Sequence, residues 1–380
     1  MTHPGAIEAV PLAGSARDGL VSAACRALAA GFPSAEDSAI SAPRRVLVIK
    51  PGSLGDVLLA GAALASLRKG FPDAEISHLV GDWARPAAAG SPSVDSLIVC
   101  GPVGTPGAYT LRQYVRTANR IRARRFDAAI VLDRSPLMAL LPWLAGIGVR
   151  AGLDSDGRGF ALNYRTPVPP ARHEGELFLD VVRRIGLPVV RPDTWFRPPA
   201  AASAKARGLL AEMNPPSGCL VLAPGGGVNP GARRLDKRWA PDGFVRVARR
   251  LRDDAGVLPV LVGDANDQDA VGAVRVGLSG GPLLDLSRRL EFAEIGALLA
   301  LAGRFLANDS AIAHLGAAVG SRGVVIYTAT DPDIYGPQGG KVARLVAAPG
   351  AGVEGAAVAA LMPRLDRPGS GSGPGRTAFL

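Results

Sequence analysis

A cation, two glycines and a carboxylate fall within one short segment, KPGSLGD at residues 50–56. Gly52 and Gly55 allow the backbone to turn sharply and to approach a ligand closely. Asp56 then stands where a helix would begin. A carboxylate there either caps the helix, where the helix dipole favours it, or serves as a general base at a cleft. The residue types alone leave both interpretations open.

A second glycine-rich turn, LAPGGG at residues 222–227, is followed by the basic sequence RRLDKRW at 233–239. A turn of this kind presents backbone N–H groups to an anion, and Gly225 and Gly226 lie within it. The cations that follow would neutralise a diphosphate, although a solvated basic loop has the same composition. These cations are Arg233, Arg234, Lys237 and Arg238.

A third candidate segment is NDSAIAH at residues 308–314. Asp309 or Ser310 is a natural N-cap, and the free N–H groups of a helix start suit a phosphate. His314 falls about one turn later, on the same side as Ser310. A lone histidine usually makes a structural hydrogen bond, but its place beside a phosphate-competent helix start favours a role in binding. A fourth segment, TATDP at 328–332, has the composition of a turn.

Short apolar runs precede each of these segments, as strands would. Strands that alternate with helices predict parallel sheets with helices on both faces. The ligand site of such a sheet lies outside the carboxyl ends of its strands, which is where the four segments fall. We expect strands at 45–49, 75–80, 96–100, 128–132, 219–222, 258–262, 304–307 and 323–327, and helices at 58–69, 110–124, 244–252, 292–302 and 311–319.

Two proline-rich stretches, at 166–170 and 191–199, separate these elements into two series. A chain of 380 residues has room for about two domains. We therefore expect two open α/β units that face each other across a cleft. Their bounds are 44–198 and 199–365, with a flexible extension at 1–43, in which 21–30 has the composition of a short helix, and a flexible tail at 366–380.

The net charge of +10 favours anionic partners, including nucleotide phosphates, phosphorylated lipids, anionic membranes and nucleic acid. Basic and aromatic residues do not alternate as in nucleic-acid modules, so we expect no nucleic-acid partner. Cys25, Cys100 and Cys219 are odd in number and widely spaced, which argues against a disulfide framework or a zinc site. We expect buried, reduced thiols in a cytoplasmic protein. The most apolar stretch, at 137–149, is too short to span a membrane.

Arginines recur every fourth residue in the helix expected at 110–124. Residues at this spacing lie on one helix face. Such a stripe is either a solvated face or a surface for a phosphorylated lipid core or an anionic membrane. The stripe consists of Arg112, Arg116, Arg120 and Arg124.

Four segments, in this order, resemble the ADP-heptose:lipopolysaccharide heptosyltransferases of glycosyltransferase family 9: RVLVIKPGSLGDVLL, DKRWAP, NDSAIAHLGAAVG and TDPDIYGPQG. They span residues 45–340, and HEGELFLDVVRRIGL, from His173, resembles the helix that closes the family's first domain. The resemblance implies the GT-B fold, with two Rossmann-like domains facing across a cleft. It also implies an inverting, metal-independent transfer of a sugar, here a heptose from ADP-heptose, to a hydroxyl of a lipopolysaccharide-core acceptor.

The resemblance also implies roles for single residues. Asp56 matches the catalytic base, and Lys237 matches the lysine that contacts the donor phosphates. The segment 263–267 matches a loop near the nucleoside. Ala311 stands where the family often has glycine, and its methyl group would crowd the donor or shift the selectivity for the donor. The remaining donor-side residues are Gly225, Gly226, Arg233, Arg234, Asp309, Ser310 and His314, and the acceptor-side residues are Lys50, Ser53 and Gly55.

Two other functions fit the same residues. A related glycosyltransferase would act on a small secondary metabolite, and a non-catalytic protein would only bind a nucleotide sugar. For the enzyme, we expect a nucleotide-sugar donor, a glycolipid or small-molecule acceptor and no cofactor. We also expect the protein to be cytoplasmic and peripheral to the inner face of the membrane.

Overall fold

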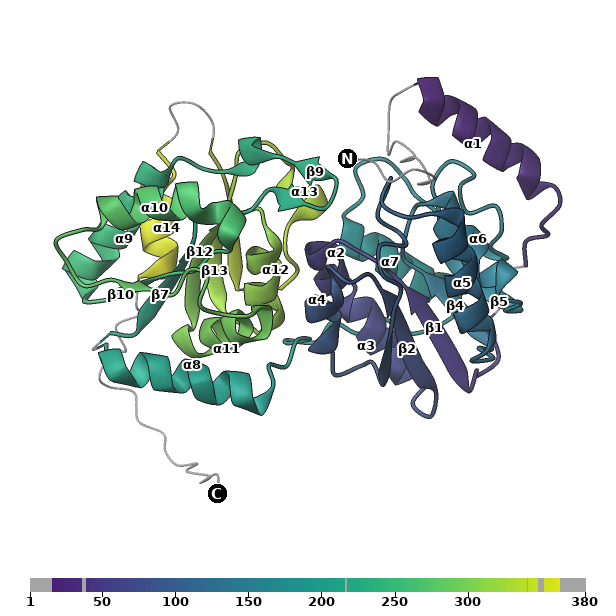
Figure 1. Cartoon of the computed structure of the whole chain (residues 1–380), viewed down its shortest axis with the longest axis horizontal. Helices are drawn as coiled ribbons and strands as arrows, with labels where there is room; N and C mark the ends of the chain where they lie inside the picture. The colour runs from purple at the N-terminus through teal and green to yellow at the C-terminus, as the bar shows by residue number, and fades with distance from the viewer. Residues whose placement is uncertain (1–15, 36–38, 216, 340, 348–351, 363–380) are drawn as a thin grey trace.

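The computed structural model of the chain describes residues 16–35, 39–215, 217–339, 341–347 and 352–362. It contains two six-stranded parallel sheets with the same strand arrangement (Figure 1). The first sheet has the order β3-β2-β1-β4-β5-β6, and the second has the order β11-β10-β7-β12-β13-β14. In both, the order reverses beside the first strand of the series, which is the place where doubly wound sheets bind ligands.

Alternate side chains of the first central strand, β1 (Arg45–Ile49), enter two different cores. Val46 and Val48 pack with α3 and α7, whereas Leu47 and Ile49 pack with α5 and α6. A strand that is buried on both faces reads as a continuous apolar run, as this one does. The other elements of this half are α2 (Leu54–Leu59), α3 (Gly61–Gly70), β2 (Glu75–Val80), α4 (Arg85–Ala89), β3 (Ser96–Val99), α5 (Leu111–Arg122), β4 (Ala128–Val131), α6 (Pro136–Leu144), β5 (Val149–Asp154), β6 (Tyr164–Pro167) and α7 (Glu174–Arg184).

The second half repeats this layering around β7 (Cys219–Ala223). Leu220 and Leu222 pack with α9, α10 and α14 on one face, and Val221 packs with α8, α11 and α12 on the other. The elements are α8 (Ala200–Met213), a hairpin of β8 (Val228–Asn229) and β9 (Ala232–Arg233), η1 (Leu235–Lys237), α9 (Pro241–Ala255), β10 (Leu258–Leu261), η2 (Ala265–Asp267), α10 (Gln268–Gly277), β11 (Leu284–Asp285), α11 (Phe292–Ala302), β12 (Arg304–Asn308), α12 (Ala311–Ala318), β13 (Arg322–Tyr327), α13 (Pro332–Tyr335), β14 (Val342–Val346) and α14 (Glu354–Leu361).

One of the apolar clusters contains residues from both halves. Residues 185–198, which follow α7, form the linker between the two halves. Val57 and Leu58 of α2 belong to the same buried cluster as Phe196 of this linker and Leu315 of α12. The helices α2 and α12 therefore pack against each other and bring the starts of both helices to the same place (Figure 1). The boundary proposed at 198/199 falls between the linker and α8.

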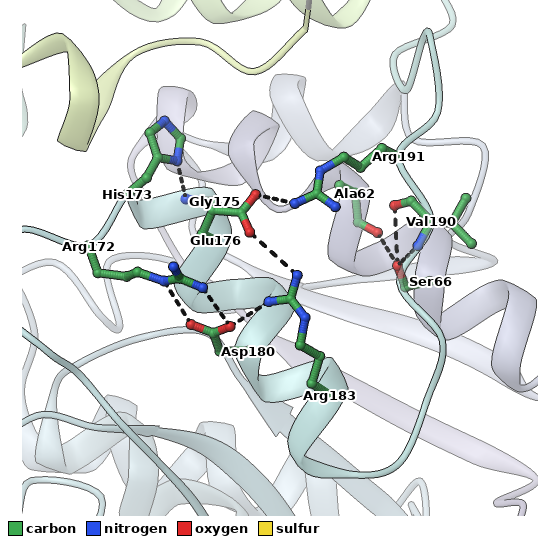
Figure 2. Close-up of polar contacts among 10 residues, drawn as sticks. All are labelled: Ala62, Ser66, Arg172, His173, Gly175, Glu176, Asp180, Arg183, Val190 and Arg191. Carbon is green, nitrogen blue, oxygen red and sulfur yellow. Dashed lines mark hydrogen bonds and ion pairs between the residues drawn. The ribbon is translucent and has the colours of Figure 1, made fainter.

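The linker is fastened to the first half by polar contacts (Figure 2). Arg191 Nη2 lies 2.5 Å from Glu176 Oε1 on α7. The fully buried Ser66 on α3 accepts a hydrogen bond from Val190 N at 2.8 Å. On the other side, Trp195 N donates to Ala318 O at 2.9 Å, so the linker bonds to both halves.

Part of the extension expected to be flexible is packed onto the first half, so that expectation is wrong for residues 16–35. Helix α1 (Ala16–Ala29) buries Cys25 against Phe160. The ring of Phe32 then packs edge-on against Trp143 and Phe160 at 5.4 Å. The gain from burying these apolar groups offsets the entropy cost of ordering the segment. Residues 1–15 and the tail expected at 366–380 lie outside the described residues.

The three cysteines are free and buried, as expected. Within the described ranges, no helix combines the length and the apolar character that crossing a bilayer requires. In the same ranges, His, Cys, Asp and Glu side chains form no group of three that would hold a metal ion.

Candidate active site

A cleft of about 890 Å³ opens between the two halves, at the carboxyl ends of both sheets. It brings together segments that are far apart in the sequence, including the starts of α2 and α12 and the glycine-rich turn after β7. Asp56 and Lys237 both line it, one from each half. Its wall also includes Ser53, Gly55, Asp82, Trp83, Gly225, Gly226, Arg234, Asp264, Asp267, Arg288, Glu291, Phe292, Asp309, Ser310, Ala311, His314 and Thr330.

Asp56 is held by a buried ammonium group at the start of α2. Lys50 Nζ lies 3.1 Å from Asp56 Oδ2 and 3.4 Å from Asp133 Oδ2. The Lys50 side chain is 9% exposed and lies behind Asp56, whose own side chain is 37% exposed to the cleft. Burial alone lowers the pKa of Lys50, but the carboxylates of Asp56 and Asp133 outweigh it and raise the pKa above its usual value. Lys50 therefore stays charged beside Asp56.

Asp56 also takes part in capping its helix, as one of the two interpretations of this residue predicts. Ser53 is the N-cap of α2, and its backbone N–H points at Asp56 Oδ2 at 3.4 Å. That distance is long for a hydrogen bond. The capping contact therefore leaves the carboxylate able to accept another donor from the cleft.

A second ion pair lies behind Lys50. Arg134 pairs with Glu174 at the start of α7. Burial raises the pKa of Glu174, and the charge of Asp56 adds to this effect, while Arg134 and Lys50 oppose it. Lys50 Nζ also lies 5.9 Å from the centre of the Phe178 ring. The base candidate is thus embedded in a network of alternating charges.

Asp133, Arg134 and Glu174 are not among the site residues that the sequence predicts. Asp133 and Arg134 directly follow β4, which is the position from which sheet residues reach a ligand site. Asp82 and Trp83 follow β2 in the same way and line the cleft. The rule that ligands bind at the carboxyl ends of strands would have identified these four residues after β2 and β4, but not Glu174.

On the opposite wall, Lys237 is anchored by Asp309. Lys237 Nζ donates to Asp309 Oδ2 at 2.8 Å, and the Thr330 hydroxyl donates to the same oxygen at 2.7 Å. Asp309 is 6% exposed, whereas the Lys237 side chain is 24% exposed. The carboxylate therefore orients the lysine, and the ammonium keeps access to the cleft.

The glycine-rich turn differs from the expected anion cradle. Gly226 N already donates to Asp267 Oδ1 at 2.8 Å, so this N–H is not free for an anion. A Cβ atom on Gly225 would lie 2.0 Å from Asp267 Cγ. Gly226 has a φ of +100°, and a Cβ there would lie 2.6 Å from Ser310 Cβ. The glycines allow this turn to pack between Asp267 and Ser310, and that packing explains why they are needed.

Arg238 holds this turn in place, a role that the sequence did not reveal. Its side chain is 9% exposed and donates to Gly226 O at 2.8 Å and to Asp267 Oδ1 at 3.1 Å. It also donates to Asn266 O at 3.0 Å. Arg238, one of the four cations in the basic segment, therefore has a structural role and fixes the 263–267 loop beside the cleft.

The other cations of the segment differ in their positions. Arg234 lines the cleft and pairs with Asp236 at 2.7 Å. Arg233 lies on β9, is exposed, and is not among the residues that line the cleft. The structure thus places Arg233 outside the cleft lining, and its contact with the donor stays a prediction.

His314 lies where the two halves meet. Ser310 is the N-cap of α12, and Ala311 begins the helix. One turn later, the His314 ring packs onto Gly55, where a Cβ atom would come within 2.9 Å of Cδ2. Burial lowers the pKa of His314, although the charges of Asp309 and Asp56 partly oppose this. The ring is therefore neutral near pH 7, and its Nδ1 has no hydrogen-bond partner among the described residues.

The TDPDIYGPQG segment closes the far side of the interface. His173 Nδ1 accepts a hydrogen bond from Gly175 N at 3.1 Å (Figure 2). Its Nε2 must then carry the proton, which it donates to Gly336 O at 2.9 Å. A Cβ atom on Gly175 would also meet the Gln338 side chain. A segment that reads as a simple turn thus connects the two halves.

The comparisons with known proteins agree with this geometry. The family Glycosyltransferase family 9 (heptosyltransferase) matches residues 114–351. Lipopolysaccharide heptosyltransferase 2 of Escherichia coli is 26% identical over 77% of this chain and 85% of that protein. Lipooligosaccharide heptosyltransferase 2 of Haemophilus ducreyi is 27% identical over 77% of this chain and 86% of that protein.

Solved structures show the same fold. A glycosyl transferase of family 9 from Veillonella parvula superposes with a TM-score of 0.70 at 19% identity, covering 81% of this chain and 88% of that one. The ADP-heptose lipopolysaccharide heptosyltransferase II of Escherichia coli gives a TM-score of 0.64 at 22% identity, covering 79% and 90%. Together with the family match over most of the chain, these likenesses lead to one conclusion: the chain belongs to glycosyltransferase family 9 and is a glycosyltransferase with the GT-B fold.

Proposed function

We propose that this protein transfers a heptose from ADP-heptose to a hydroxyl group of a lipopolysaccharide-core acceptor, with inversion at the anomeric carbon. The observation that carries the proposal is that Asp56 and Lys237 line one cleft from opposite halves. The relatives are named as lipopolysaccharide and lipooligosaccharide heptosyltransferases, which supports the choice of sugar and acceptor. A solved relative, an Escherichia coli heptosyltransferase, has ADP bound.

The donor would lie on the second half. Its diphosphate would contact Lys237, the nearby Arg234 and the N-terminus of α12 at Ser310, where backbone N–H groups and the helix dipole favour negative charge. Its nucleoside would extend along the 263–267 loop. Because Asp309 already orients Lys237, little entropy is lost when the ammonium binds the diphosphate.

The acceptor hydroxyl would approach from the first half. Asp56 would remove its proton while the hydroxyl oxygen forms a bond to the anomeric carbon, and the bond from that carbon to the diphosphate oxygen would break. The leaving group is ADP, and the negative charge that develops on it falls beside Lys237 and Arg234. A single displacement of this kind inverts the anomeric configuration.

Lys50 would keep Asp56 ready for this role. A permanently charged ammonium 3.1 Å away favours the ionised carboxylate, which is the form that accepts a proton. Asp133 gives the same ammonium a second partner when Asp56 takes up the proton. The residue thus acts through Asp56 and does not line the cleft itself.

The proposed substrates indicate where in the cell the protein would act. A nucleotide-sugar donor and a lipid-linked acceptor would meet at the cytoplasmic face of the inner membrane. We therefore propose that the protein works there as a peripheral enzyme. The net charge of +10 supports contact with an anionic lipid surface.

The test is transfer with defined substrates. The protein is incubated with ADP-heptose and with lipopolysaccharide core lacking the terminal heptose, and both ADP release and the mass of the glycan are measured. We expect the mass of one heptose to be added, and ADP-heptose to be used in preference to UDP-glucose. If calorimetry shows tight ADP-heptose binding but no core acceptor is modified, the protein is a nucleotide-sugar-binding protein. If only small metabolites are modified, the lipopolysaccharide core is not the acceptor.

A further inference from the structure

Three neighbouring helices of the first half, α1, α5 and α6, form a flank away from the second half (Figure 1). They are connected by packing: Tyr114 on α5 donates its hydroxyl hydrogen to Leu137 O on α6 at 2.6 Å, and Leu140 on α6 packs against the cluster that contains Cys25 of α1. By contrast, α2 and α4 contact the second half. We call the surface of these three helices the α1–α5–α6 flank.

Large hydrophobic side chains gather on this flank. Half of those that are exposed in the described part of the chain lie on these three helices. Apolar side chains that are grouped in this way mark a binding surface, whereas single exposed ones need no explanation. They are Leu20 and Leu28 on α1, Leu111 and Val115 on α5, and Trp143 and Leu144 on α6.

Helix α5 adds positive charge next to these side chains. The sequence from 111 to 125, LRQYVRTANRIRARR, contains six arginines and no acid. Arg120 donates to Val99 O, and the other five form no ion pair with any described residue. In the described part of the second half, by contrast, several arginines form ion pairs, for example Arg246 with Glu354 and Arg275 with Asp285. The positive charge of α5 is therefore not neutralised by the protein itself.

The first turn of α5 also forms a hollow of about 230 Å³ lined by Thr110, Arg112, Gln113 and Arg116. Thr110 and Gln113 bond to each other in a capping box, with Thr110 N donating to Gln113 Oε1 at 2.8 Å. The guanidinium groups of Arg112 and Arg116 are thus left to bind an anion. A hollow of this size between two cations fits a phosphate group.

We propose that the α1–α5–α6 flank binds the surface of an anionic lipid bilayer, with its apolar side chains at the headgroup boundary and the α5 arginines on lipid phosphates. Arginines combined with Trp and Leu are typical of interfacial surfaces, and protein–protein interfaces are depleted of charge at their core. This inference rests on the proposed function, because an acceptor carried by a lipid gives the enzyme a reason to be at a membrane.

The experiment is co-sedimentation of the full-length protein with vesicles. One set contains phosphatidylglycerol and phosphatidylethanolamine, and the other contains only phosphatidylcholine. We expect binding to the anionic set, weakening as salt rises, and little binding to the neutral set. The double variant Arg112→Gln/Arg116→Gln should bind about 30-fold more weakly, because each arginine near such a surface contributes a factor of about five.

The variant Leu111→Gln/Val115→Gln tests the apolar part and should also weaken binding to anionic vesicles. A matched control is Arg207→Gln/Arg289→Gln, which removes the same charge from two exposed arginines of the second half that form no ion pair with a described residue, and it should bind as the parent does. Equal loss in the control and in the α5 variant would show a general charge effect and overturn the proposal. Loss of a dimer in the α5 variant, seen by sedimentation without vesicles, would show that the flank binds a second copy instead.

Transfer to a detergent-dispersed acceptor fragment separates this proposal from the function itself. The Arg112→Gln/Arg116→Gln variant should keep the parent's rate with that acceptor and lose rate only when the acceptor lies in anionic vesicles. If the parent transfers no heptose to any acceptor but still binds anionic vesicles through α5, the proposed function fails and the membrane surface stands. If inorganic phosphate at equal ionic strength displaces the protein no better than chloride, the binding is to the bilayer and not to phosphate alone.

Discussion

The imidazole of His314 lies directly on the backbone of Gly55, across the boundary between the two halves of the protein. A methyl group at residue 55 would come within 2.9 Å of His314 Cδ2. Gly55 stands next to Asp56, and His314 stands one turn after Ser310, so this contact sets how far the base candidate lies from the donor side. The absence of a side chain at residue 55 thus decides the width of the cleft.

Gly55→Ala should affect the transfer step and leave donor binding almost unchanged. We expect kcat to fall by about 100-fold, because displacements on the order of 1 Å have such effects on transfer reactions, while the donor Kd changes little. The measurements are steady-state kinetics and donor calorimetry. Gly208→Ala on α8, where a Cβ atom would meet nothing within 4 Å, is the control. An unchanged kcat in Gly55→Ala would mean that the His314 contact does not set the geometry.

Asp56→Asn should remove the base and keep the fold. The amide has the same shape and cannot take up the proton, so we expect kcat to fall by about 100- to 10,000-fold. Donor binding should remain, since the donor contacts lie on the other half. Asp73→Asn, at an exposed turn, is the matched control. Full turnover in Asp56→Asn would refute the assignment of the base.

Lys50→Met should lower both the stability of the protein and the rate of the reaction. The change leaves the carboxylates of Asp56 and Asp133 close together without the ammonium between them. We expect a loss of about 3–5 kcal/mol in the free energy of unfolding, and a fall in kcat because Asp56 loses the group that holds it. Denaturant unfolding and steady-state kinetics measure the two effects.

The double variant Lys50→Met/Asp133→Asn provides the control for that prediction. It removes one of the two carboxylates, so part of the lost stability should return. The fall in kcat should remain, because Asp56 still lacks its ammonium neighbour. A kcat identical to that of the parent in both variants would exclude a positioning role for Lys50.

Lys237→Ala should weaken donor binding and slow the reaction. The ammonium is anchored to Asp309 and open to the cleft, so its loss removes a charge that acts on the diphosphate. A charge-assisted contact contributes about 1.5–3 kcal/mol, which corresponds to roughly a 10- to 150-fold increase in the Kd for ADP. Arg233→Ala, in the same segment but outside the cleft lining, should bind ADP as the parent does. Equal effects of the two changes would argue for a diffuse charge effect.

His78 should make the protein sensitive to acid. This residue is fully buried on β2, and burial lowers its pKa to about 4 from an ordinary value of 6.5, with the charge of Lys50 adding to the effect. The folded state therefore binds this proton less readily than the unfolded chain does. Its contribution to stability is complete above pH 6.5 and is lost as the pH falls towards about 4, by on the order of 3 kcal/mol.

The comparison that isolates this effect is His78→Gln, which can still donate to Lys50 O. We expect its free energy of unfolding to fall less than that of the parent between pH 6.5 and 4.5, as measured by urea unfolding at each pH. Parallel curves for the two proteins would mean that other groups, such as His173 and His314, account for the acid sensitivity.

The central strands could be read from the sequence because strands that are buried on both faces must be apolar throughout. The runs at 45–49 and 75–80 match β1 and β2 residue for residue, and 292–302 matches α11. Two edge strands, β6 and β14, carry no such signal. Tyr164–Pro167 contains a proline and lies at a sheet edge, and Val342–Val346 is only half-buried, so pairing with a neighbour decides both.

The sequence by itself determined which segments follow strands, and therefore that Asp56, Lys237 and the start of α12 would face a ligand. Tertiary packing alone decided what each side chain does there. Contacts between residues far apart in the chain turn Lys50 behind Asp56, close the glycine turn onto Asp267, assign Arg238 to the scaffold and place His314 on Gly55. Local spacing cannot encode such contacts, because they depend on how two separately folded sheets meet at α2 and α12.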